Sequence, residues 1–207
     1  VGSDGAVHPG HGLLSTDVLS NQSAIAKQGV ALRDAIQRVL SLTNRDKVIL
    51  MGHSMGGLAS REYLQNPNNW TNPYVNHHVA KLITTGTPHG GSNSTAPYIV
   101  SLYNGLNNRS EAMRDLKTSY SNSNANGVFL YGGYEYNSIM DDGSNYYYNV
   151  DVNCNGSTGD LITGLNNKSF NNDIDYSYII GKCDTCTLSP GFVDGDGVVP
   201  LFSSNLS

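Results

Sequence analysis

Apolar residues in the first part of the chain recur at helical spacing and then in a short unbroken run. Ser20 or Asn21 can cap a helix that extends to about Leu42, because apolar side chains recur there at positions 25, 32, 36, 39 and 40. The segment 47–51 that follows is short and mostly apolar, which is typical of a strand buried on both faces of a parallel sheet.

A second helix and a second strand follow directly. Residues 57–64 have a helical pattern that Asn66 and Pro67 end, and residues 79–85 form another apolar run. Strand, helix and strand with a crossover of this length predict a βαβ unit. The predicted fold class is therefore α/β, with a mainly parallel sheet flanked by helices.

The pattern changes after Gly91. Apolar residues at helical spacing predict a helix within 96–120, and a pair of glycines indicates a hairpin at 128–136. Residues 137–172 are rich in Asn, Ser, Gly and Tyr and poor in aliphatic side chains. This part of the chain does not continue the βαβ pattern.

A third core strand is predicted at 176–181, so we interpret the segment at about 92–173 as a cap insertion between two core strands. The length of 207 residues fits one domain, and a hydrophobic content of 38% can build a core. The predicted organisation is one α/β domain over residues 1–207.

The charge balance excludes some classes of partner. Twelve Lys and Arg against 17 Asp and Glu provide no basic surface for a phosphate backbone, so we expect no nucleic-acid binding. No apolar run approaches the roughly 18 residues that cross a bilayer. Only 14% of the residues are charged, and Gly, Tyr, Asn and Ser supply the polar surface, which favours a secreted, extracellular protein.

The three cysteines favour a structural role. Cys183 and Cys186 form a C-x-x-C pair inside a loop, and Cys154 stands alone. A zinc site would need a fourth ligand, and a thioredoxin-type site would place the pair at the start of a helix. We expect a small disulfide loop at Cys183 and Cys186, with a partner for Cys154 outside this chain.

Residues 52–57, Gly-His-Ser-Met-Gly-Gly, contain G-x-S-x-G between the predicted strand and helix. A serine on such a strained turn projects its hydroxyl above the sheet edge, and glycines are expected two residues before and after it, where side chains would collide. Ser54 is therefore the candidate nucleophile, and the Met55 N–H can donate to an oxyanion. His53 points to the opposite face and is expected to pack beneath the turn.

Three segments together resemble the lipase and GPI inositol-deacylase-like group of the α/β hydrolases. They are Gly-His-Ser-Met-Gly-Gly at 52–57, Gly-Thr-Pro-His-Gly-Gly-Ser at 86–92 and Asp-Gly-Asp-Gly-Val-Val-Pro at 194–200. The resemblance covers roughly residues 20–92 and 175–200. It implies an α/β-hydrolase fold with a lid or acyl-binding cap, and an esterase or lipase activity.

The resemblance also implies roles for particular residues. Ser54 is the nucleophile, the Met55 N–H is an oxyanion donor, and Asp196 is the triad acid because it matches the aspartate of that family's D-G-x-V segment. Asp194, in the same loop, is the alternative acid. Both aspartates can also be turn residues in a Gly-rich loop.

The family places the histidine base after the acid, but no histidine follows Asp196. His89 is therefore expected to be structural or to lie near the site. The other histidines are expected in a loop or in solvent: His8, His11, His77 and His78.

Other parts of the family pattern are also missing, namely the strands before the first helix and a second oxyanion donor. The chain begins at Val1 with neither an initiator Met nor a signal segment. We therefore expect an incomplete catalytic domain, with its histidine beyond Ser207, in preference to a hydrolase-like protein that has lost its chemistry.

Asp151–Gly156, with the sequence D-x-N-x-N-G, matches the start of a calcium loop. Ile162 stands where the loop's last carboxylate is expected, although Asp160 lies two residues earlier. Because this segment is so rich in Asn, calcium is a secondary hypothesis and we expect no cofactor.

The function predicted is that of a serine hydrolase that cleaves carboxylic esters of the lipid or acylglycerol type through an acyl-enzyme on Ser54. It would make transient contact with a lipid interface. Thioester or amide cleavage is the alternative within the class. The alternative from another class is a non-catalytic, Asn- and Tyr-rich extracellular binding module on a hydrolase-like scaffold.

Overall fold

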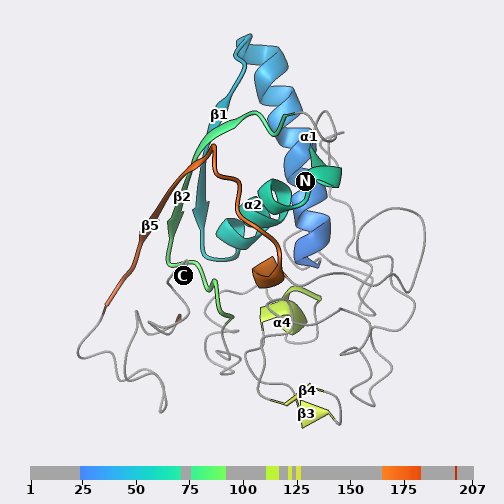
Figure 1. The fold of residues 1–207 in the computed structure, drawn as a ribbon, viewed down its shortest axis with the longest axis vertical. Helices are drawn as coiled ribbons and strands as arrows, with labels where there is room; N and C mark the ends of the chain where they lie inside the picture. Colours follow the sequence, from blue (N-terminus) through green and yellow to red (C-terminus); the bar gives the residue numbers. More distant parts are fainter. Residues whose placement is uncertain are drawn as a thin grey trace, which may run out of the picture.

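The computed structural model contains a parallel sheet with a layer of helices packed on one face (Figure 1). It describes residues 24–70, 76–91, 111–116, 121–122, 125–126, 165–182 and 199. The sheet has the strand order β1-β2-β5, and the three strands are Val48–His53, Val79–Thr85 and Asp175–Ile179. Both pairings are parallel, so the predicted α/β class is confirmed.

The helices packed on the sheet are α1 (Ile25–Thr43), before β1, and α2 (Met55–Gln65), which connects β1 to β2 and is followed by the short 3-10 helix η2 (Pro67–Asn69). The remaining described elements are the helix α4 (Glu111–Leu116), the paired strands β3 (Ser121–Asn122) and β4 (Ala125–Asn126), and the 3-10 helix η3 (Leu165–Asn167). The predicted helix at 57–64 and the predicted strands at 79–85 and 176–181 therefore agree with α2, β2 and β5 to within two residues or so.

The core lies between the helices and one face of the sheet. Its members come from α1, α2, β2 and the residue before β5, and all are buried: Ile36, Tyr63, Leu64, Val79, Leu82 and Ile174. Gly29 allows α1 and α2 to approach closely, because a Cβ there would lie 2.7 Å from Glu62 Cγ. This packing fixes α2, and with it the residue at its N-terminus.

The start of α1 is capped by a residue distant in sequence. Ser20 and Asn21 lie outside the described residues, and the described helix begins at Ile25. The Ile25 N–H donates to Asp115 Oδ2 of α4 at 2.8 Å, and Asp115 is fully buried. An N-terminal N–H is usually satisfied by a neighbouring side chain, so no local pattern in the sequence indicates this long-range cap.

The opposite face of the sheet differs from the prediction. Ile49 and Met51 of β1 are 65% and 71% exposed, and Ile179 of β5 is 56% exposed. The prediction that the first strand is buried on both faces is therefore wrong for the described part of the chain, since the described helices cover only the face that bears Leu82. Among the described strands, β1 lies at one edge of the sheet.

Of the predicted insertion, α4, β3 and β4 lie at the end of the molecule where β1 and β2 finish (Figure 1). Its last residues, 165–173, include η3 and lead into β5. That the insertion forms a lid stays a prediction. The predicted hairpin at 128–136 lies outside the described residues. No helix within the described ranges is long and apolar enough to cross a membrane.

Candidate active site

Ser54 occupies a one-residue turn between β1 and α2. Its backbone has φ 52° and ψ −129°, in the left-handed half of conformational space that non-glycine residues seldom adopt. The Ser54 N–H donates to Thr85 O of the neighbouring strand at 3.0 Å, and its carbonyl accepts from the Gly57 N–H at 3.1 Å. This is the strained strand-to-helix turn that the G-x-S-x-G pattern predicts.

Glycine is required on both sides of Ser54, but not at both of the predicted positions. A Cβ at Gly52 would lie 2.6 Å from the backbone N and Cα of Gly57. A Cβ at Gly57 would lie 2.2 Å from Thr87 Oγ1. A Cβ at Gly56 would have no described atom within 4 Å. Within the described part of the chain, the prediction of a collision two residues after the serine is therefore wrong. The crowded position is Gly57, the next residue.

Met55 is the first residue of α2, where backbone N–H groups have no partner within the helix. Its N–H has the location that the predicted oxyanion donor requires, and its role stays a prediction. The Met55 side chain is contacted by Gln28 of α1, whose Nε2 lies 3.8 Å from Met55 Sδ. No pattern in the sequence singles out Gln28, because 27 residues separate it from Met55.

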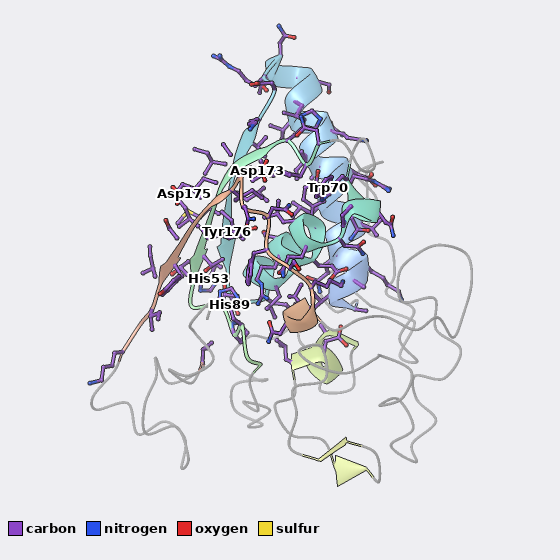
Figure 2. The ribbon with its side chains drawn as sticks, viewed as in Figure 1. His53, Trp70, His89, Asp173, Asp175 and Tyr176 are labelled. Carbon is purple, nitrogen blue, oxygen red and sulfur yellow. The ribbon has the colours of Figure 1, made fainter. Side chains whose placement is uncertain are left out.

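His53 is exposed, which corrects the expectation that it packs beneath the turn. Its register partner is Thr85, and the side chain belongs to the sheet face that the described helices leave uncovered. The alternation of side chains along a strand correctly predicted that His53 points to the face opposite that of the residues beside it in sequence. The expectation failed because no described element packs on that face. Figure 2 shows His53 where β1 ends.

His89 is buried and has both ring nitrogens engaged. Arg61 can only donate, so its Nη1 donates to His89 Nδ1 at 3.3 Å, and His89 Nε2–H then donates to Thr84 Oγ1 at 3.1 Å. Burial, and secondly the charge of Arg61, lower the pKa of His89 to about 3. A neutral, doubly bonded imidazole is a structural group, as the sequence predicted.

Sequence reasoning missed the polar junction around His89, which consists of Arg61, Gln65, Thr84, His89 and Asn166. Arg61 donates to Gln65 Oε1 at 2.9 Å and to Asn166 Oδ1 at 2.8 Å. Asn166 Nδ2 donates to the His89 carbonyl at 3.1 Å. The only sign available in the sequence was a charged residue at a position of α2 that the helical pattern turns toward the core.

His77 is also structural, and it is buried instead of solvated as expected. Its Nδ1 accepts from the Val79 N–H at 3.0 Å, so Nε2 carries the proton that it donates to Asp173 Oδ2 at 3.1 Å. Some desolvation raises the pKa of Asp173, but the hydrogen bond from His77, a backbone hydrogen bond and the charge of Lys47 outweigh it and lower that pKa. Figure 2 shows Asp173 at the end of the sheet away from His53 and His89. The pair is therefore remote from Ser54.

His78, predicted to be solvated, is half-buried, and its Nδ1 lies 2.7 Å from the Asp46 carbonyl. No histidine within the described ranges hydrogen-bonds the Ser54 hydroxyl.

The remaining predicted residues lie outside the described part of the chain: His8, His11, Asp151–Gly156, Cys154, Asp160, Cys183, Cys186, Asp194 and Asp196. Close to the last of these, Val199 is buried, 2% exposed. No cluster of three metal-ligating side chains occurs among the residues that the structure describes.

Residues 17–158 match a family model described as the PGAP1-like alpha/beta domain. The chain is 34% identical over 133 residues to the GPI inositol-deacylase of Kluyveromyces lactis, covering 56% of this chain and 12% of that protein. It is 30% identical over 99 residues to triacylglycerol lipase 2 of Saccharomyces cerevisiae, covering 48% of this chain and 26% of that protein.

A solved structure has the same fold. The mature lipase BlEst2 of Bacillus licheniformis superposes with a TM-score of 0.52 at 20% identity, over 88% of this chain and 62% of that chain. The fold is accordingly the α/β-hydrolase fold. The chain spans less than two thirds of the length of each of these proteins.

Gly52→Ala is expected to lower the free energy of unfolding by about 1–3 kcal/mol, because its Cβ would meet immovable backbone of Gly57. Gly56→Ala is the matched control and is expected to be neutral or to stabilise by up to about 1 kcal/mol, as alanine does in a helix. Urea unfolding of both variants measures the difference. Equal stabilities would show that the turn is not crowded at Gly52.

His89 should make the protein less stable in mild acid. Its folded pKa of about 3 lies below the unfolded value of 6.5, so the unfolded state binds more protons between these values. Stability should therefore fall as pH falls through this window, by at most about 1.4 kcal/mol per pH unit. In His89→Gln this contribution disappears, whereas His53→Gln, an exposed control, keeps it. The measurement is the free energy of urea unfolding from pH 7 to 4.5. The same pH dependence of this free energy in the unsubstituted protein and in His89→Gln would contradict the prediction.

Proposed function

Since the chain belongs to the PGAP1-like alpha/beta domain family and has the α/β-hydrolase fold, we propose that it hydrolyses carboxylic esters of lipids with Ser54 as nucleophile. The observation that carries the proposal is the backbone of Ser54, which is held at φ 52° between β1 and α2. A serine in that conformation at the carboxyl end of a parallel strand presents its hydroxyl outside the sheet.

The reaction proceeds by acyl transfer in two steps. Ser54 Oγ attacks the ester carbonyl carbon while a histidine base removes the hydroxyl proton, and the base returns it to the leaving alcohol. Water then attacks the acyl-enzyme and releases the acid. The Met55 N–H, at the positive end of α2, stabilises the oxyanion. Nucleophile, base and acid are all side chains, so the reaction uses no cofactor.

The base comes from outside the described residues. Both nitrogens of His89 and of His77 are bonded elsewhere, and the pair of His77 and Asp173 lies at the wrong end of the sheet. Asp196 orients the base, with Asp194 as the rival acid. Ser54 is therefore the member of the proposed triad that lies within the described part of the chain.

The substrate class follows from the two curated relatives, a deacylase and a triacylglycerol lipase by name. Both names denote removal of an acyl chain, so we propose a fatty-acyl ester of a polyol as the substrate, met at a lipid surface. The low content of charged residues supports export from the cell as its location.

Ser54→Ala in the full-length protein is expected to lower kcat for p-nitrophenyl ester hydrolysis by about 10⁴-fold, as loss of a triad member does. Labelling by a fluorophosphonate probe should also disappear. Ser60→Ala is the matched control on the same helix, because the Ser60 hydroxyl already donates to the Gly56 carbonyl. Persistent hydrolysis or labelling in Ser54→Ala would exclude Ser54.

Asp196→Asn should reduce kcat strongly while leaving the unfolding transition unchanged, because the acid holds the base in its productive tautomer. Asp194→Asn, two residues away in the same loop, should reduce it far less. Steady-state kinetics of both variants decide between them. The opposite order would assign the acid to Asp194.

A further inference from the structure

Arg61 joins α2 to two segments that are remote from it in sequence. It lies about two turns after Ser54 and is 2% exposed, although a buried guanidinium is costly to desolvate. Its side chain donates to the loop after β2 at His89 and to η3 at Asn166, and it lies 5.0 Å from the centre of the Phe170 ring. One cation thus fixes the relative positions of three parts of the chain.

His89 transmits this constraint to the loop that follows β2. Its ring is held by Arg61 from one side and by Thr84 from the other, and its carbonyl by Asn166. The His89 N–H in turn donates to the Thr87 carbonyl at 3.0 Å. The residues from Thr84 to His89 therefore form a tight bend whose shape depends on the imidazole.

This bend forms one wall of the nucleophile turn. The Thr85 carbonyl accepts the Ser54 N–H, and the Thr87 side chain fills the space that a Gly57 side chain would need. A backbone in the left-handed region persists only where its surroundings leave no alternative. Around Ser54, the Thr85 carbonyl and the Thr87 side chain provide this restraint.

We propose that Arg61 is a positioning residue for the hydrolase site: through His89 it fixes the Thr84–His89 bend against the Ser54 turn. The inference rests on the proposed function. Lysine cannot replace the guanidinium, because a single ammonium lacks the planar fork that reaches His89 and Asn166 together.

Arg61→Lys in the full-length protein is expected to reduce kcat for a short, soluble p-nitrophenyl ester by about tenfold or more, with little change in KM, as a displaced nucleophile does. Lys168→Met is the matched control. Lys168 Nζ contacts both Glu62 carboxylate oxygens at 2.8 and 2.7 Å, so it ties the same helix to the same returning segment. This control should lose stability yet keep its kcat, whereas equal kcat values in the two variants would overturn the inference.

Asn166→Ala provides a second variant, because Asn166 is exposed and its loss should not prevent folding. It should reduce kcat several-fold, less than Arg61→Lys, by releasing the His89 carbonyl. Hydrogen exchange read by mass spectrometry should show faster exchange of peptides covering 52–57 and 84–89 in both variants but not in Lys168→Met. Unchanged exchange would overturn the positioning role, even if the unsubstituted protein hydrolyses no ester and the proposed function itself fails.

Discussion

The conformation of Ser54 is the constraint on which the rest of the described structure depends. The chain leaves β1 and enters α2 within one residue, and α2 must return over the sheet face that carries Leu82. A positive φ at a residue with a Cβ costs about 1–3 kcal/mol. The Thr85 carbonyl and the close contacts at Gly52 and Gly57 hold it in place. The sheet, the helix packing and the loop after β2 all meet at this turn.

Helix α2 carries the turn at one end and a row of buried polar links along its side. Arg61 bonds to His89 and Asn166, and Glu62 pairs with Lys168. Buried charges of this kind add little net stability compared with apolar packing, but removing one partner is costly. Their effect is to fix the segment 165–168 against α2, where the chain comes back to the core after the insertion. The position of the nucleophile and the return of the chain after the insertion are thus linked through one helix.

The two histidines that are buried within the described part of the chain show how hydrogen bonding prevents an imidazole from acting as a base. In His77 and in His89 a donor, the Val79 N–H or the Arg61 guanidinium, occupies Nδ1 and forces the proton onto Nε2. That proton is then donated to Asp173 or to Thr84. Neither ring has a lone pair free for a serine hydroxyl. A histidine close to a nucleophile in sequence or in space is therefore not a base unless one nitrogen is free to accept.

The sequence alone determined the βαβ order, the nucleophile turn and the structural role of His89, because these depend on local spacing, on glycine and on family motifs. It did not determine what covers each face of the sheet, so the sequence predicts that Ile49, Met51 and His53 are buried, whereas all three are exposed. Nor did it reveal the Asp115 cap, the Arg61 links or the burial of His77. These side chains meet partners about 28 to 105 residues away, and only the tertiary structure decides which distant donors and acceptors come within hydrogen-bonding distance.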